Sequence, residues 1–140
     1  MTQEDKELLL RDLCARLPYK VKVYGNYKYN NGDRIVDDKK IEALDLSSLD
    51  WFVNGIDIKP YLRPMSSMTE EERKEYYSTQ YRYTHRIYPD SADFSEHTEY
   101  SWTAETIDWL NAHHFDYRGL IPKGLALEAS KDMYNEIKEE

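Results

Sequence analysis

Residues 19–59 consist of short alternating runs that are separated only by turn residues. In the first run Val21 and Val23 alternate with polar residues, which is the period of a strand with one buried face. The following Asn30-Asn31-Gly32 segment supplies residues that tolerate positive φ, so it predicts a hairpin that returns through residues 34–36. No segment between these runs is long enough to be a crossover helix, so the pattern favours antiparallel strands over parallel βαβ units.

Further short strands are predicted along the same stretch, with a turn at Asp37-Asp38; they cover residues 41–46, 51–53 and 56–58. Strands this short, joined by tight turns, favour a small curled antiparallel sheet or an SH3-like barrel.

Helices are expected on both sides of this β-rich part. Thr2 is a candidate N-cap, and the apolar residues that follow recur at helical spacing until Pro18; they are Leu9, Leu10, Leu13, Cys14 and Leu17. Within that stripe Cys14 is expected to be a small core residue. The Thr69 and Glu72 pair is a capping box that predicts a second helix to residue 80, and Thr103 begins a third helix to residue 113.

A single α+β domain follows from a length of 140 residues. It comprises a helix at 1–18 that packs on the β-rich part at 19–64, then a helical part at 65–140 with a long loop at 81–100, where Pro89, Asp90 and Ser91 interrupt any helical period. The expected core is apolar and comes from all of these elements: Leu9, Leu10, Leu13, Leu17, Val21, Val23, Ile35, Leu44, Leu46, Phe52, Ile58, Ile107 and Leu110.

Composition excludes several classes of protein. The single cysteine cannot form an intramolecular disulfide or a Cys-pair zinc site. The net charge of -8 opposes binding to a phosphate backbone. Neither a cationic leader followed by an apolar core nor a run of about 18 apolar residues is present, so a cytoplasmic protein without membrane association is expected.

His113, His114 and Asp116 are the residues that come closest to a metal site, and they define one alternative function, a metal-dependent enzyme. Adjacent helical residues point about 100° apart, so the two imidazoles do not share a ligand geometry on a helix. Asp116 and Arg118 are instead expected to form an ion pair that orders a turn. With no nucleophile or cofactor loop in a recognisable setting, the sequence predicts a protein that is not an enzyme, with no catalytic residue, cofactor or metal.

Thirteen tyrosines are the compositional exception. Tyrosine combines a rigid contact face with a polar tip and is enriched at protein interfaces, although a small domain poor in Phe also uses it at core edges. The predicted binding residues are the clustered tyrosines Tyr24, Tyr27, Tyr29, Tyr81, Tyr83 and Tyr88. They indicate a small protein-interaction module. Its partner is another protein whose basic surface complements residues 37–72, which hold nine acidic and four basic residues.

The second alternative is binding of single-stranded nucleic acid through the hairpin at residues 19–34. Four basic residues alternate there with tyrosines, a pattern that suits phosphate contacts and base stacking: Lys20, Lys22, Lys28 and Arg34. The same pattern also describes the polar face of any strand, and the net charge opposes nucleic acid, so this function ranks second to protein interaction.

Three segments resemble an uncharacterised family of small proteins from gut Bacteroides-type genomes and their prophages or mobile elements. They are KELLLRDLCARLPY at 6–19, KPYLRPMSSMTEEE at 59–72 and DWLNAHHFDYRGLIPKGLALEA at 108–129. The resemblance implies an N-terminal helix, a variable β-rich middle and a helical C-terminal part, and it brings no assigned activity. Two positions depart from the family pattern: Lys20 replaces an expected Gly, and Ser130-Lys131-Asp132 replaces Pro-Glu-Gly.

Overall fold

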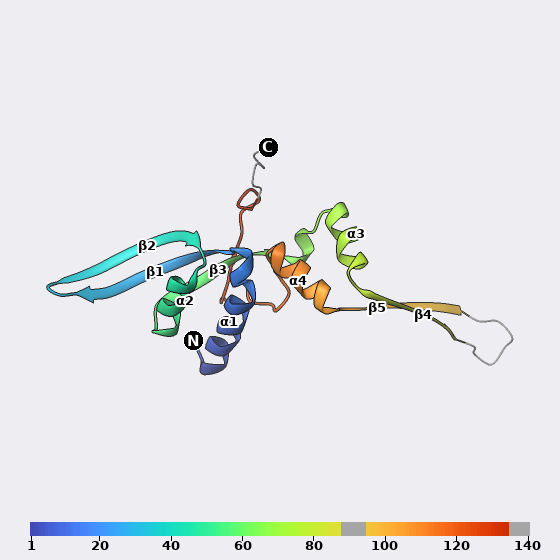
Figure 1. Cartoon of the computed structure of the whole chain (residues 1–140), viewed down its shortest axis with the longest axis horizontal. Coiled ribbons are helices and arrows are strands. Elements are labelled where there is room, and N and C mark those ends of the chain that lie inside the picture. Colours follow the sequence, from blue (N-terminus) through green and yellow to red (C-terminus); the bar gives the residue numbers. More distant parts are fainter. Residues whose placement is uncertain (88–94, 135–140) are drawn as a thin grey trace. The chain divides into compact units, whose positions relative to one another are not determined.

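Two units make up the chain in the computed structural model, which describes residues 1–87 and 95–134 (Figure 1). The first unit contains residues 1–67 and 114–134, and the second contains residues 68–113. Helices and antiparallel strands occur in both units, so the α+β class is confirmed. Among the described residues no helix combines the length and apolarity needed to cross a bilayer.

The N-terminal helix α1 (Gln3–Arg16) begins as predicted, because the Thr2 hydroxyl accepts a 3.0 Å hydrogen bond from the amide of Asp5. A short 3₁₀ turn (Leu17–Tyr19) follows it. The buried face of α1 carries Leu9 and Leu13, but also a charged pair, Asp12 and Arg16. Cys14 is exposed, so its assignment to the core was wrong. The buried face of α1 contains Asp12 and Arg16 beside the two leucines, and this face does not include Cys14.

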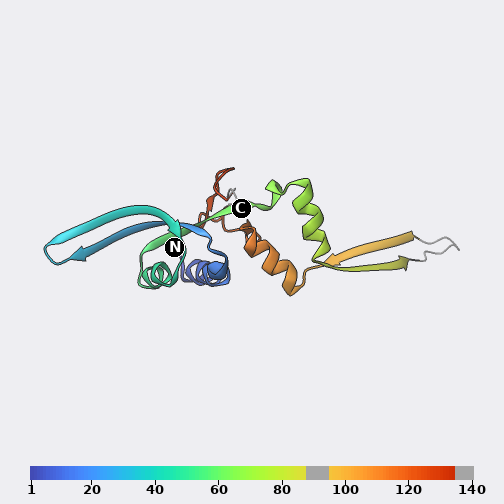
Figure 2. The ribbon, with the colours of Figure 1, turned by 45° about the horizontal axis from the view of Figure 1, so that its top comes forward.

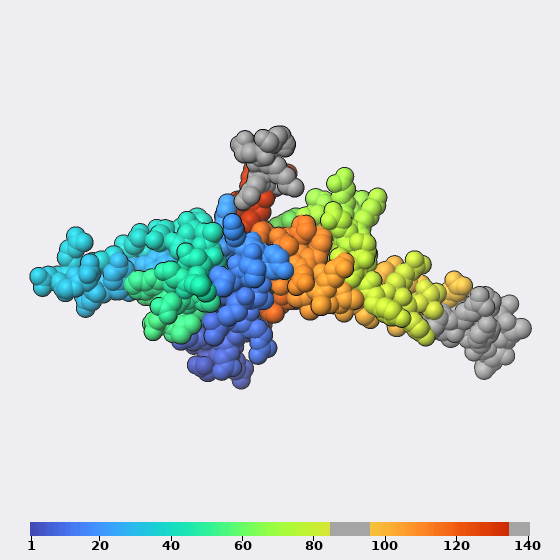
Figure 3. Space-filling model, viewed as in Figure 1, coloured from blue at the N-terminus to red at the C-terminus, as the bar shows by residue number. Residues whose placement is uncertain are grey.

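The sheet of the first unit begins with a long antiparallel hairpin of β1 (Lys22–Asn31) and β2 (Arg34–Ala43), which turns at Gly32 with φ +67°. Strand β3 (Asp57–Pro64) pairs antiparallel with β1, and within β1 this pairing covers only residues 23–26. The rest of β1 therefore pairs only with β2, and this distal part of the hairpin stands clear of its unit in the space-filling view (Figure 3). The predicted turn at residues 37–38 was wrong, because β2 runs through it.

Two short C-terminal strands extend this sheet on β3, namely β6 (Phe115–Asp116) and β7 (Leu127–Glu128). Both pair with β3 in parallel, so the sheet is mixed where an antiparallel sheet was predicted. A pairing between strands more than 50 residues apart leaves no local turn signal, and the prediction from turns could not include it.

Helix α2 (Leu46–Val53) replaces the strand predicted at residues 51–53. The Asp45 side chain caps the helix by accepting a 2.8 Å hydrogen bond from the amide of Ser48, whose hydroxyl in turn accepts from the amide of Asp45. The Ser48 amide lowers the pKa of the Asp45 carboxyl. Helices α1 and α2 lie side by side on one face of the sheet (Figure 2).

The core of the first unit lies between these helices, the sheet and the C-terminal segment. Its buried apolar residues are Leu9, Leu13, Val21, Val23, Tyr27, Leu44, Phe52, Ile58, Leu62, Leu120, Leu125 and Ala126. Most of the predicted core residues of this unit are among them, while Leu10 and Leu17 pack at its edge. Two predictions were wrong: Ile35, on the distal hairpin, and Leu46, in the first turn of α2, are exposed.

The second unit consists of two helices joined by a hairpin. Helix α3 (Glu70–Ser78) and helix α4 (Ala104–Ala112) confirm the predicted helices and their caps, Thr69 and Thr103. Leu110 is buried as expected, whereas Ile107 is 38% exposed and was wrongly placed in the core. The predicted loop at 81–100 was wrong, because β4 (Tyr81–Ile87) and β5 (Ser95–Ser101) form an antiparallel pair.

Candidate functional site

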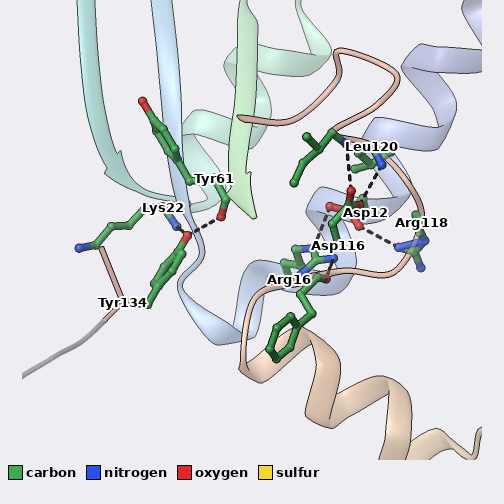
Figure 4. Close-up of polar contacts among 10 residues, drawn as sticks. Asp12, Arg16, Lys22, Tyr61, Asp116, Arg118, Leu120 and Tyr134 are labelled. Atoms are coloured by element: carbon green, nitrogen blue, oxygen red, sulfur yellow. Dashed lines mark hydrogen bonds and ion pairs between the residues drawn. The ribbon is translucent and has the colours of Figure 1, made fainter. Parts of the chain in front are cut away.

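A buried network of charged groups ties the C-terminal segment to α1 (Figure 4). The Arg16 guanidinium donates a 2.8 Å hydrogen bond to the Asp12 carboxylate and a 2.6 Å hydrogen bond to the carbonyl oxygen of Phe115. Arg118 donates to the other oxygen of Asp12 at 3.1 Å. The side chains of Asp12 and Arg16 have no solvent-exposed surface, so a ligand cannot reach them and their role is structural.

Asp116 has a different partner from the one predicted. Its carboxylate accepts hydrogen bonds from the backbone amides of Leu120 and Ile121, both at 2.9 Å. The expected ion pair between Asp116 and Arg118 was wrong, because Arg118 pairs with Asp12 on α1. Asp116 therefore organises the turn that delivers Leu120 to the core.

Tyr134 anchors the end of the described chain on the sheet (Figure 4). Its hydroxyl accepts a 2.8 Å hydrogen bond from the amide of Lys22 and donates one of 2.8 Å to the carbonyl oxygen of Tyr61. Its ring stacks on that of His114, with 3.8 Å between the ring centroids. Burial raises the pKa of the Tyr134 phenol to about 12.

The three residues of the predicted metal alternative have separate structural contacts. The His113 ring stacks on Trp109, and its Nδ1 lies 2.9 Å from the Trp109 carbonyl oxygen. The His114 ring lies on Tyr134, and the Asp116 carboxylate binds two amides. Within residues 1–87 and 95–134 no group of three or more His, Cys, Asp or Glu side chains is arranged to hold a metal ion.

The partner strand brings both signs of charge to the hairpin at 19–34, because residues 35–43 contain two lysines and three acidic residues. Lys28 lies opposite Asp37 in the register, and Lys39 lies opposite Asn26 on the same face. The Lys22 ammonium donates a 2.8 Å hydrogen bond to the carbonyl oxygen of Met133 and so contributes to the fold. The basic residues of this face are therefore interrupted by Asp37, whereas single-strand binding favours a continuous basic groove.

An aromatic recess lies where α2 meets the hairpin. Tyr27 and Tyr29 point to the same face of β1, and Trp51 of α2 contacts both rings, with centroid separations of 5.6 Å and 5.0 Å. Tyr24 lies on the opposite face of the strand, so it is not part of this group. Gly25 leaves room for the Tyr27 ring, which lies against the position that a Cβ at Gly25 would occupy.

Charged residues of β2 complete this recess, whose volume is about 100 Å³. Asp38, Lys40 and Glu42 lie opposite Tyr27, Gly25 and Val23 and so share their face of the sheet. The Lys40 ammonium lies 5.1 Å from the centre of the Tyr27 ring and 3.3 Å from a Glu42 carboxylate oxygen. Burial and Glu42 raise the pKa of the Tyr27 phenol to about 12.

A second concentration of aromatic rings lies on the unit of residues 68–113. We call it the aromatic surface; its members each expose 43–58% of their area and are Tyr77, Tyr81, Tyr83, Tyr100 and Trp102. Half-buried Tyr76 supports two of these rings, because it contacts Tyr77 and Trp102 and its hydroxyl accepts a 2.9 Å hydrogen bond from the Trp102 indole. In the register of the hairpin, Tyr81 and Tyr83 share one face, and Tyr100 lies on the other.

No family model, curated protein or solved structure matches this chain. Of the predicted binding tyrosines, Tyr27 and Tyr29 come together in the recess, and Tyr81 and Tyr83 in the aromatic surface, while Tyr88 lies outside the described residues. Trp51 and Trp102 were missed, because the sequence there predicts only a strand at 51–53 and a helix that begins at Thr103, and neither signal identifies a binding ring.

The first unit also has a cavity of about 620 Å³ between the start of α1, the turn after α2 and residues 123–125. Its lining mixes opposite charges, namely those of Lys6, Lys59 and Lys123 with those of Asp5 and Asp57. Neither a nucleophile nor a general base in a catalytic arrangement lines it, so its composition favours no reaction class.

Proposed function

We propose that the chain is a non-enzymatic protein-interaction module, and that it binds a basic partner protein through the aromatic surface of residues 68–113. The observation that carries the proposal is the exposure of five large aromatic side chains within one small unit. Exposed apolar groups at this density mark binding sites in soluble proteins, and Tyr and Trp dominate the binding energy of interfaces.

The supporting contacts reduce the entropic cost of binding. The Trp102 indole donates to the Tyr76 hydroxyl, and the Trp109 indole donates a 3.3 Å hydrogen bond to the Glu75 carboxylate. At the base of the hairpin, the Thr103 hydroxyl donates to the carbonyl oxygen of Thr79 at 2.8 Å. Rings held in place before the encounter lose less side-chain freedom on binding.

The negative charge of residues 68–113 favours a basic partner. The sequence at 68–113 contains ten acidic and four basic residues, so this unit carries most of the negative charge of the chain. Arginine-rich surfaces combine attraction to carboxylates with stacking on aromatic rings. A basic protein segment is therefore the complementary partner, and the resemblance to proteins of mobile elements favours a host protein or a phage-encoded one.

Affinity capture from a host lysate tests the proposal, with one arm treated with nuclease and one washed at raised salt. We expect one protein that survives nuclease and whose recovery falls when Tyr81 and Tyr83 are both replaced by Ala. Recovery of nucleic acid alone, with binding that falls steeply with salt, would instead support the alternative at residues 19–34. A protein captured equally by the double variant would reject the aromatic surface.

A further inference from the structure

We propose that the aromatic recess of the first unit is a binding site for an alkylated ammonium group, such as a methylated lysine side chain or a free quaternary ammonium compound. The site uses no residue of 68–113 and is independent of the partner surface proposed above. It consists of three aromatic rings and two carboxylates around one small opening.

The recess already contains a cation from the chain itself. The Lys40 ammonium lies over the Tyr27 ring and contacts the Glu42 carboxylate. An aromatic ring and a carboxylate of the recess therefore already bind a cation in the free protein. The Lys40 side chain is 51% exposed, and therefore it can leave for solvent at little cost. Lys40 thus shows the charge and the position of a guest, and it competes with that guest for the recess.

The chemistry of the lining favours an alkylated ammonium over a primary one. A primary ammonium is strongly hydrated and loses that water when it enters a small aromatic site. An alkylated ammonium spreads its charge over methyl groups that fit against ring faces, which is how aromatic cages recognise such ligands. At about 100 Å³ the recess suits one head group, because pockets for drug-sized ligands are about 300–1,000 Å³.

The geometry of the hairpin places the rings and the carboxylates on one face of the sheet. Asp38 and Glu42 belong to one face of β2, and Tyr27 and Tyr29 to the same face of the neighbouring strand. Trp51 on α2 closes one side by meeting Tyr27 edge to face, with the ring planes at 84°. The cage is therefore built on regular secondary structure, which positions its groups more reliably than a loop.

A titration with tetramethylammonium chloride, compared with sodium chloride at equal ionic strength, tests the inference. The readout is the NMR signal of the Trp51 indole N–H, assigned by its loss in Trp51→Phe. We expect a saturable shift with tetramethylammonium only, and about fivefold tighter binding in Lys40→Gln, which removes the internal competitor. Glu42→Gln should weaken binding several-fold, and Tyr24→Phe, on the opposite face of β1, should leave it unchanged.

Two further arms distinguish the sources of the guest. Choline represents a free quaternary ammonium compound, and a short peptide with trimethyllysine, paired with its unmodified version, represents a protein side chain. Tighter binding of the trimethylated peptide than of choline would identify a protein guest, and the reverse order would identify a small molecule. The inference is overturned if folded wild type and folded Lys40→Gln show no shift beyond that of sodium chloride, or if Lys40→Gln and Glu42→Gln bind as wild type does.

Discussion

The guanidinium of Arg16 on α1 donates a 2.6 Å hydrogen bond to the carbonyl oxygen of Phe115, a residue 99 positions later in the chain. Asp12, one helical turn before Arg16, supplies the compensating charge at 2.8 Å. These two residues link the N-terminal helix to the C-terminal segment within the first unit. The charges are isolated from water, so neither can lose its partner without a large cost.

Replacing Asp12 tests this dependence. Asp12→Ala leaves the buried Arg16 charge without its carboxylate, and we expect it to lower the free energy of unfolding by about 3–5 kcal/mol in urea titrations. Arg11→Ala is the matched control, because Arg11 is an exposed charge on the same helix, and its effect should be within about 0.5 kcal/mol. A loss below about 1 kcal/mol for Asp12→Ala would show that the network is not needed for stability.

Lys20 adopts a left-handed conformation, with φ 56° and ψ 44°, at the end of the turn after α1. A side chain is unfavourable there by about 1–2 kcal/mol, while glycine costs more backbone entropy on folding. We expect Lys20→Gly to raise the free energy of unfolding by about 0.5–1 kcal/mol, because the relief of steric strain exceeds the added entropic cost of glycine. Lys20→Ala should be nearly neutral, and equal effects of the two substitutions would contradict the conformational explanation.

Removing the Tyr134 hydroxyl leaves the amide of Lys22 and the carbonyl of Tyr61 without their shared partner. Tyr134→Phe should therefore cost about 1–3 kcal/mol in thermal or urea unfolding, although the ring is retained. Tyr81→Phe, at an exposed position on β4, is the control for loss of a tyrosine hydroxyl and should change stability little. Equal stability of Tyr134→Phe and wild type would show that the C-terminal anchor contributes nothing.

Two tyrosines make stability sensitive to alkaline pH. The phenols of Tyr27 and Tyr134 have pKa values raised from 10.0 to about 12 in the folded chain. Between these values the unfolded state loses protons that the folded state retains, so stability is complete below pH 10 and falls as pH rises toward 12. Urea titrations across this window should show the decline, and Tyr134→Phe should show a smaller one. An unchanged slope in Tyr134→Phe would argue against a buried Tyr134.

Local signals predicted the helices well. The hydroxyls of Thr2, Thr69 and Thr103 cap helices at the expected positions, because a cap depends on residues within one turn. Helix α2 has the same kind of cap at Asp45, yet the β-propensity of Trp51-Phe52-Val53 suggested a strand. Missing α2 also hid the recess, because Trp51 reaches Tyr27 and Tyr29 only from a helix on that face of the sheet.

The sequence also contains a signal for the hairpin of β4 and β5 that the prediction did not use. Tyr81 and Tyr83 alternate with Arg82 and Thr84, which is the period of a strand, but the turn residues around Pro89 led to a loop assignment for the whole stretch. The contact of Arg16 with Phe115 had no local signal at all. Nothing near either residue in sequence specifies it, since it depends on how the C-terminal segment crosses α1.

The central claim is that the aromatic surface of residues 68–113 binds a basic protein, and removing two of its rings tests that claim most directly. Recovery of the nuclease-resistant partner is measured for wild type, for Tyr81→Ala/Tyr83→Ala, and for Leu46→Ala, which removes an exposed apolar side chain from the other unit. The account predicts that the double variant loses at least about tenfold in affinity while Leu46→Ala binds as wild type does. Equal recovery by all three folded proteins, or equal losses in both variants, would contradict it.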